Sequence, residues 1–474
     1  MAAVLWPALV NRFPLVMGDS FRYLLEAQGD YSWVSSQFYG YFLGLFSGTS
    51  LWVVAVVQAV VAAAVVATFL RRVAGLSHPA AAMVIIVLAA TSPLALFAGL
   101  IMTDLWFGLG LVAAVVLLVG ERSLPSDLAM TAVVAFTAAA HPAALPLLGL
   151  LVMAAGVVAV WRRTRAGTWG DAGGSGLLAL GVGIAVLSLM VNNQVVWGKL
   201  SPNPHSSVVA FAYLLGHGDL EDELAGCTQW EMCTVSQRPP AGINGFNRFL
   251  FNEGGVLYTE LGGPVAYAPE ATEIVLTHVT NDPIAYAKRV YATGVDQLFL
   301  VGAFNHVSAV MERMNVNRIS QIAAFSQADG PRFAASRTFR RTLDLGPYTG
   351  VGMVFAWLGV AATAGALVGR LVRRHSRRAT AWPATHRRPV GGATVLAALY
   401  VVHAFVVGTT AYSAARYGGR MLWLLVLAWW ALASGWARAA RDARQGSGAG
   451  ETRPSSCGAD PDVTVELGNE PAKL

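Results

Sequence analysis

The stretch LWVVAVVQAVVAAAVVATFLRR, residues 51–72, is an apolar run that closes on two arginines. About 20 apolar residues cross the hydrocarbon core of a bilayer as a helix, so residues 51–70 predict one membrane span. The whole chain has the same character, because 55% of its 474 residues are hydrophobic, 13% are charged and the mean hydropathy is +0.53. Soluble domains carry about 25% charged residues. The composition therefore predicts an all-α polytopic membrane protein.

Further apolar runs lie on both sides of this stretch. The other predicted spans are about 79–97 with a break near Pro93, 104–120, two spans within 128–161 that turn at His141-Pro142, 175–194, 349–369, 391–411 and 419–437. Residues 1–12 are apolar but too few to cross a bilayer, so either the coding sequence begins upstream or the chain begins with a half-span. We expect about 9–10 transmembrane helices with a truncated first one. No cleavable signal peptide is expected, since a basic n-region and a clear cleavage site are lacking.

Arginines gather at alternate ends of the predicted spans. The clusters are Arg71 and Arg72, Arg122, Arg162 to Arg165, the stretch 370–388, and Arg438, Arg441 and Arg444. Basic residues favour the cytoplasmic side, so all of these ends should be cytoplasmic and the alternate loops exported. The net charge of +6 then reflects membrane orientation, and no nucleic-acid partner is expected. We expect a multi-pass plasma-membrane protein with a cytoplasmic C-terminus and a large exported loop.

Four parts follow from this map. They are an N-terminal transmembrane module with an exported loop (1–194), an exported, mainly helical domain (195–346), C-terminal transmembrane helices (347–438) and a disordered cytoplasmic tail (439–474). The tail is rich in Gly, Ser, Pro and acidic residues, a composition typical of disorder. In the exported segment, Asn281-Asp282-Pro283 predicts a helix N-cap followed by proline at the first helical position.

The cysteines fit an exported domain. Cys227 and Cys233 lie six positions apart in the exported segment, where an oxidising environment favours a small disulfide loop over two free thiols. Cys457 should be unpaired, and no cysteine spacing matches a zinc site. The acidic run GDLEDE, residues 218–223, is read as a solvated loop rather than a Ca²⁺ site, because its spacing matches no known calcium loop.

Ionisable residues on the exported face are the candidates for function, because charges near membrane depth are costly. They are Asp19 with Arg22 and Tyr23 in VMGDSFRY, Asp104 in MTDLWFGL, His141 in TAAAHPAALP, and Arg416, Tyr417 and Arg420 in ARYGGRML. Each has a structural alternative. Asp19 and Asp104 could cap helices, and His141 could be an ordinary turn residue. The two arginines could anchor at lipid headgroups, although arginine on this face opposes the positive-inside bias and suggests an anionic ligand.

At this point the pattern resembles a known family. GDSFRYL in the first exported loop, MTDLWFGLGL at the next exported turn, AFTAAAHPAALPLLGLLVM and the late segment ARYGGRMLWLLVLA resemble, in order and position, the GT-C superfamily of membrane glycosyltransferases that use polyprenyl-phosphate sugars. The likeness, of the protein mannosyltransferase and aminoarabinose transferase kind, covers roughly residues 1–200 and 400–435. No single motif is specific. The chain departs from the family in its short first span, in His141 where a cationic residue is commoner, and in Gly418-Gly419 where proline is common.

The resemblance implies an enzyme that moves a sugar from a polyprenyl-phosphate donor in the membrane lipid to an envelope glycan or protein. By similarity, Asp19 is the base of an inverting transfer and Asp104 is the second acidic position, which assists the acceptor or, in some members, a divalent metal. Cations suit the lipid phosphate that leaves, a role for Arg416 and Arg420 with Tyr417, and for His141 more weakly. Arg22 and Tyr23 join this binding set. No cofactor and no metal ligands are assigned.

Two other classes stay open from the sequence. A transporter or flippase for a lipid-linked precursor should show internal repeats or interrupted helices near the midplane, and no convincing repeat is present. A catalytically inactive accessory protein could keep the same scaffold, because fold does not imply function. A cavity that holds Asp19 and Arg416 together favours the enzyme. A site closed by apolar side chains favours the accessory protein.

Overall fold

The computed structural model describes residues 1–166, 172–300, 316–375, 384–410 and 415–448. These ranges fold into helices and contain no strand beyond one isolated β-bridge, so the predicted all-α class is confirmed for them. Among the described residues, five helices contain stretches long and apolar enough to cross a membrane: α4 (Leu51–Arg72), α9 (Leu145–Ala166), α10 (Ala172–Trp197), α21 (Ala384–Thr410) and α22 (Ala415–Gly448). The described part of the chain is therefore all-helical with five candidate membrane spans.

The remaining predicted spans are helices that are short, or whose apolar stretch is short. They are α1 (Ala2–Asn11), α5 (His78–Thr91) with α6 (Leu94–Gly99), α7 (Asp104–Val119), α8 (Leu124–Ala140) and α20 (Gly346–His375). The chain breaks before Pro93 and turns at His141-Pro142, where the 3₁₀ helix η1 (Pro142–Ala144) begins, as predicted. Proline lacks the N–H that a continuing helix needs, which explains both breaks.

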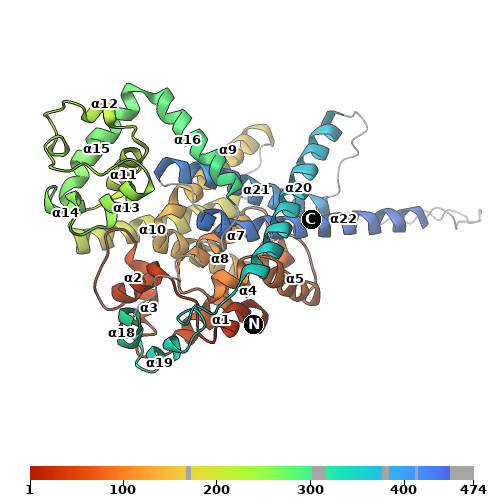
Figure 1. Cartoon of the computed structure of the whole chain (residues 1–474). Helices are drawn as coiled ribbons and strands as arrows, with labels where there is room; N and C mark the ends of the chain where they lie inside the picture. The colour runs from red at the N-terminus through yellow and green to blue at the C-terminus, as the bar shows by residue number, and fades with distance from the viewer. Residues whose placement is uncertain (167–171, 301–315, 376–383, 411–414, 449–474) are drawn as a thin grey trace, which may run out of the picture.

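Helix α7 lies at the centre of the bundle (Figure 1). All its side chains from Asp104 to Leu117 are buried, and it packs against α4, α8, α10, α21 and α22. A Cβ atom at Gly108 would lie 2.5 Å from the Trp423 ring of α22, and one at Gly110 would lie 2.5 Å from Thr137 of α8. Glycines let helix backbones approach closely in membranes. These contacts fix α7 between its neighbours, with Asp104 at its first turn.

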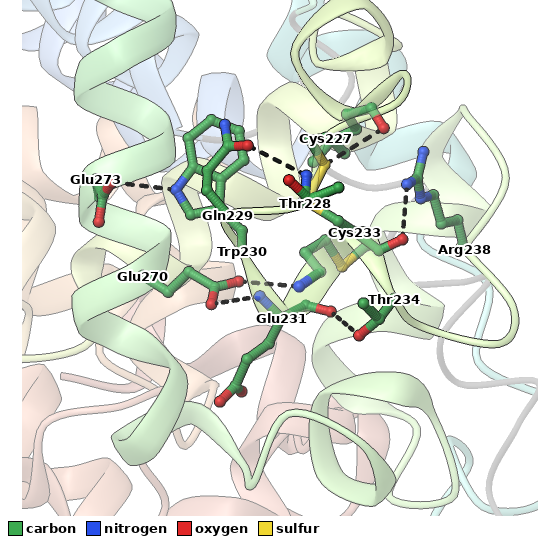
Figure 2. Close-up of a disulfide and its surroundings, with 12 residues drawn as sticks. Cys227, Thr228, Gln229, Trp230, Glu231, Cys233, Thr234, Arg238, Glu270 and Glu273 are labelled. Atoms are coloured by element: carbon green, nitrogen blue, oxygen red, sulfur yellow. Dashed lines mark hydrogen bonds between the residues drawn. A yellow bond between two sulfur atoms is a disulfide. The ribbon is translucent and has the colours of Figure 1, made fainter.

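A second core lies at one end of the bundle (Figure 1). It is formed by α11 (Ser206–His217), α12 (Glu221–Leu224), α13 (Ile243–Phe251), α14 (Val256–Thr259) and α15 (Pro264–Asn281), called here the α11–α15 domain. Phe211, Tyr213, Phe249 and Tyr267 are fully buried in its core. Cys227 and Cys233, predicted to pair, form a disulfide beside 3₁₀ helix η2 (Glu231–Cys233), whose Glu231 and Met232 N–H groups donate to Glu270 of α15 (Figure 2).

The segment 195–346, expected to form one domain, divides between two cores. Helix α16 (Pro283–Phe299) packs along α21, and α18 (Val316–Phe325) packs against α2 (Gly18–Glu26). Phe325 and Phe333, from α18 and α19 (Asp329–Ala334), are buried in the core of the bundle. The carboxylate of buried Asp329 accepts hydrogen bonds from Ser50 Oγ (2.9 Å) and Leu51 N (2.6 Å), which caps α4. Long-range capping of this kind joins the two halves of the chain.

Local signals in the polar segment predicted its structure well. The Asp282 side chain accepts from Ala285 N at 2.8 Å and caps α16, which confirms the predicted N-cap with Pro283 following it. The exception is the acidic run 218–223, which was predicted to be a solvated loop. It is partly helical in α12, and its Asp219 and Glu223 side chains are only 16% and 15% exposed, because they contact Arg289 and His278. Among the described residues, no group of three or more His, Cys, Asp or Glu side chains could hold a metal ion.

The first residues of the predicted tail are helical. Residues 439–448 continue α22 rather than beginning a disordered segment. Their sequence, AARDARQGSG, opens with Ala and Arg, which are strong helix formers, and this extends the preceding span. Cys457 and the rest of the predicted tail lie outside the described residues.

Candidate functional site

The polar loop of residues 13–28 is held against the start of α7 by backbone hydrogen bonds. Leu15 N donates to Gly99 O (2.8 Å), and Ile101 N donates to Leu15 O (2.9 Å). Helix α2 begins next, with Met17 at its N-cap and Ser20 Oγ accepting from Met17 N (3.0 Å). Asp19 therefore does not cap this helix. It lies in the first turn, where the helix dipole favours a negative charge, and its side chain points toward the arginines of the site.

Asp104 is the first residue of α7, and it follows the segment 99–101 that is hydrogen-bonded to Leu15. Thr103 occupies the N-cap position, so the alternative of Asp104 as the N-cap is wrong. The Asp104 side chain is 1% exposed and faces two arginines of α22. A buried carboxylate in the first turn gains from the helix dipole and from these cations together.

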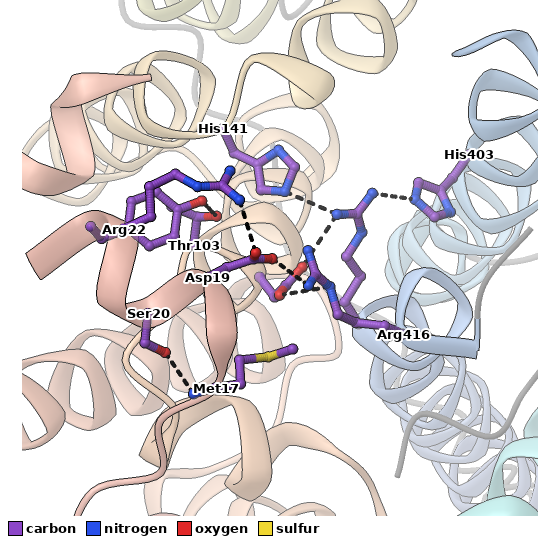
Figure 3. A network of polar contacts seen from close by, with 11 residues as sticks. Met17, Asp19, Ser20, Arg22, Thr103, His141, His403 and Arg416 are labelled. Atoms are coloured by element: carbon purple, nitrogen blue, oxygen red, sulfur yellow. Dashed lines mark hydrogen bonds and ion pairs between the residues drawn. The ribbon is translucent and has the colours of Figure 1, made fainter. Parts of the chain in front are cut away.

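Arg416 contacts Asp19 (Figure 3) and also lies within reach of Asp104. Its Nη1 lies 2.6 Å from Asp19 Oδ2, and its Nε lies 3.5 Å from Asp104 Oδ2. Asp19 Oδ1 also accepts from Arg22 Nη2 at 3.1 Å. The pair of Asp19 and Arg416 joins positions 397 residues apart in the sequence. The structure thus brings the predicted base and a predicted phosphate ligand into direct contact.

Arg420 lies deeper, with its side chain 3% exposed. Its Nη1 lies 3.3 Å from Asp104 Oδ1 and 2.9 Å from His141 Nε2, and its Nη2 lies 3.0 Å from His403 Nε2. An arginine only donates, so both imidazoles accept at Nε2 and are neutral with their proton on Nδ1. The guanidinium also stacks 4.2 Å from the Phe107 ring centroid. These contacts hold the Arg420 side chain in one position.

The cluster is electropositive. Arg22, Arg416 and Arg420 face Asp19 and Asp104, and three cations against two anions leave one net positive charge when the histidines are neutral. Nε of Arg416 and Nε of Arg420 are buried without a hydrogen-bond acceptor. Side chains 17% and 3% exposed are not headgroup anchors, so the snorkelling alternative for these two arginines is wrong. Fixed donors with spare positive charge suit a phosphate group.

A cavity of about 450 Å³ opens beside the cluster. Asp19, Arg22, His141, Arg416 and Arg420 lie in its wall. Residues of the α2–α3 loop, of α10, of α21 and of the α11–α15 domain complete the wall, where α3 is Gln37–Gly44. The volume is in the range of small-molecule sites. These five predicted site residues therefore share one cavity with both polar and apolar walls.

Of the three remaining predicted site residues, only Asp104 lies outside the cavity wall. Its carboxylate contacts Arg416 and Arg420. Tyr23 is 8% exposed, and its hydroxyl shares a 3.1 Å hydrogen bond with Thr103. Burial raises the pKa of Tyr23, so it stays protonated at the edge of the cavity. Tyr417 lines the cavity with its ring 4.9 Å from the Arg420 guanidinium.

The sequence reasoning missed His403. It lies in α21, is 2% exposed and fixes Arg420. A histidine in the apolar run LAALYVVHAFVVG was a usable signal, because ionisable residues inside a span are functional candidates. The cavity wall contributed by Trp33, Trp197 and His205 was also missed, and nothing local in the sequence places these three together.

Comparison with models of protein families, with curated proteins and with solved structures found no match to this chain.

Proposed function

We propose that the chain is an integral membrane glycosyltransferase of the GT-C kind, which transfers a sugar from a polyprenyl-phosphate donor to an envelope acceptor on the exported face of the plasma membrane. The observation that carries this proposal is the direct contact of Asp19 with Arg416 in the wall of a 450 Å³ cavity, next to Arg420. The carboxylate can act as the base, and the two arginines beside it can stabilise the phosphate that leaves.

In the proposed reaction, the acceptor hydroxyl attacks the anomeric carbon while the bond from that carbon to the donor phosphate breaks. The hydroxyl proton passes to the Asp19 carboxylate, and the anomeric centre is inverted. The transition state resembles an oxocarbenium ion, so a carboxylate nearby also favours it electrostatically. The leaving phosphate gains negative charge, which Arg416 and Arg420 stabilise more in the transition state than in the ground state.

Donor binding resolves an apparent conflict at Asp19. Without a ligand, the carboxylate is bonded to Arg416 and Arg22, which weakens it as a base. A phosphate that enters beside Arg416 competes for the same Nη1 donor and releases Asp19 Oδ2 toward the acceptor. Asp104 keeps both arginines of α22 in place during this exchange, because its contacts to them lie behind the cavity wall.

The exposure and arrangement of the site residues also distinguish the enzyme from an accessory protein and from a transporter. An accessory protein with a closed site would place apolar side chains around Asp19, whereas Asp19 and Arg416 side chains are 29% and 17% exposed. The charged groups of the site contact one another in a single cluster, which favours catalysis over transport. The arginine distribution supports an orientation with the α11–α15 domain exported.

The test is lipid analysis of a deletion strain complemented with wild type, Asp19→Asn or Asp30→Asn. Asp30 is exposed on the loop after α2 and serves as the matched control. We expect the deletion and Asp19→Asn strains to accumulate a polyprenyl-phosphate sugar and to carry an under-glycosylated envelope, while Asp30→Asn behaves as wild type. Equal amounts of Asp19→Asn and wild-type protein in the membrane fraction exclude a folding effect. Full complementation by Asp19→Asn, or no accumulation in the deletion strain, contradicts the proposal.

A further inference from the structure

His205 is a buried histidine with unsatisfied ring nitrogens. It lies at the N-cap of α11 and is 3% exposed. Neither Nδ1 nor Nε2 has a hydrogen-bond partner. Buried polar atoms are nearly always paired in native proteins, so an imidazole with two unpaired nitrogens in a cavity wall is placed to bind a polar group that enters the cavity.

Two tryptophans enclose this imidazole. The ring centroids of Trp197 and Trp33 lie 5.4 and 6.0 Å from that of His205, both nearly perpendicular to it. Trp33 is fixed in turn, because its Nε1 donates to the Tyr258 hydroxyl at 2.9 Å. The site is therefore built from three separate parts of the chain, the α2–α3 loop, the end of α10 and the α11–α15 domain.

His205 lies in the wall of two cavities at once. One is the 450 Å³ cavity that contains Asp19 and Arg416. The other is a groove of about 590 Å³ between the start of α11 and α15. Residues 203–206 line both spaces, so His205 marks their junction. A ligand in the groove would reach the Asp19 cavity at this point.

The lining of the groove selects a ligand class. Its polar residues are mainly hydroxyl and amide groups, such as Ser201, Asn203 and Thr272, and Lys199 is the one charged residue among the described residues that line it. Burial lowers the pKa of His205 to about 4, so the ring is neutral, with one donor and one acceptor. A sugar hydroxyl both donates and accepts. The two tryptophans line the adjoining 450 Å³ cavity rather than the groove, and tryptophan faces there suit the apolar face of a sugar ring that passes His205.

We propose that this groove is the acceptor site and that it binds a neutral glycan chain, with His205 hydrogen-bonding a sugar hydroxyl between Trp33 and Trp197. The term acceptor rests on the proposed function, whereas glycan binding does not. The glycan runs along the groove and presents its terminal hydroxyl past His205 toward Asp19. The acceptor of the transfer is then a carbohydrate rather than a protein side chain.

The test is calorimetric binding of the full chain in phospholipid nanodiscs, because sugar-based detergents would compete. The probes are the neutral tetrasaccharides mannotetraose, cellotetraose and maltotetraose, with acidic tetragalacturonate and a Ser/Thr-rich octapeptide as comparators. We expect at least one neutral tetrasaccharide to bind with a Kd below about 10 mM. His205→Phe should weaken it about tenfold, His205→Gln about threefold or less because it keeps a donor and an acceptor, and His78→Phe, exposed and outside both cavities, not at all.

Three results overturn the inference: no neutral tetrasaccharide binds, the peptide binds instead, or His205→Phe binds glycan as wild type does. If the Phe variant does not fold, the binding of the neutral tetrasaccharides and of the peptide to wild type still decides the first two results. Transfer by Asp19→Asn separates this inference from the proposed function. If wild type binds glycan but transfer does not depend on Asp19, only the proposed function is contradicted. If transfer depends on Asp19 but glycan binding does not depend on His205, only the acceptor site is contradicted.

Discussion

Asp104 illustrates how one residue differs in role from its sequence reading. By resemblance it was expected to assist the acceptor or, in some family members, a metal, whereas the structure places it outside the cavity wall as the shared counter-ion of Arg416 and Arg420. Two buried or half-buried guanidinium groups need such a partner, because an unpaired buried charge is costly. The residue matters to the site through the position of the arginines.

The first prediction concerns this counter-ion. Asp104→Asn removes the charge that faces Arg420 and should lower the free energy of unfolding by about 3 kcal/mol or more. The matched control is Glu121→Gln, which breaks an ion pair with Arg388 in which the side chains are 67% and 47% exposed. Exposed pairs contribute less than about 1 kcal/mol. Thermal unfolding in nanodiscs measures both, and equal stabilities of the two variants would refute a buried counter-ion role.

A second prediction concerns Glu26, the last residue of α2. Its side chain is buried, Ser35 Oγ donates to its Oε1, and Oε2 has no hydrogen-bond partner. Burial raises the pKa of Glu26 to about 7, a shift that the Ser35 hydrogen bond and the charge of Arg22 reduce only in part. The folded protein thus holds a proton that the unfolded chain releases near pH 4.5.

Between these pH values the unfolded state binds fewer protons, so the free energy of unfolding should fall as pH rises from about 4.5 to about 7. The total contribution is about 3 kcal/mol, and it levels off above the folded-state pKa. Glu26→Gln should flatten this dependence, while exposed Glu253→Gln should leave it unchanged. Unfolding midpoints between pH 5 and 8 provide the measurement. A wild-type profile that rises with pH over this window, with Glu26→Gln parallel to it, would show that Glu26 is charged in the fold.

At the scale of elements, α7 determines where the site lies. It is the buried centre of the bundle, and its glycines set its distance from α8 and α22. A shift of α7 along its axis would move Asp104 away from Arg416 and Arg420. Packing within the bundle and geometry at the site are therefore coupled through one helix.

The third prediction tests this coupling. Gly110→Ala places a methyl group 2.5 Å from Thr137 Cγ2, which overpacks the α7–α8 contact and should cost about 1–3 kcal/mol. Gly156→Ala in α9 is the control, because a Cβ there meets nothing within 4 Å and alanine favours a helix. Thermal unfolding of both variants gives the comparison. Two variants of equal stability would mean that α7 is free to adjust.

Elements with local signals were predictable, and contacts between distant elements were not. Neighbouring residues determine three predicted features: the apolar helix at 51–72, the turn at His141-Pro142 and the Asp282 cap. The structure contains all three. The burial of α18 and α19 in the bundle and the bond of His403 to Arg420 depend on packing between segments far apart in the sequence. For Asp19 and Arg416, the distribution of arginines among the loops predicted only that both residues lie on the same face of the membrane.

At the scale of the whole molecule, two cores enclose the candidate chemistry. The helical bundle supplies Asp19, Arg416 and Arg420, and the α11–α15 domain supplies His205 at the junction with the groove. Donor phosphate would bind on the bundle side, and the acceptor glycan would approach from the α11–α15 domain. The proposed transfer needs both parts, with Asp19 between them.

The central claim is that Asp19 is the base of a transfer from a polyprenyl-phosphate sugar. The most direct measurement is the rate at which the purified chain in nanodiscs releases polyprenyl phosphate from the donor lipid extracted from the deletion strain, with total envelope glycan as acceptor. We predict release by wild type and by Asp30→Asn, and release slower by about 100-fold or more for Asp19→Asn. Release by Asp19→Asn at the wild-type rate would contradict the claim.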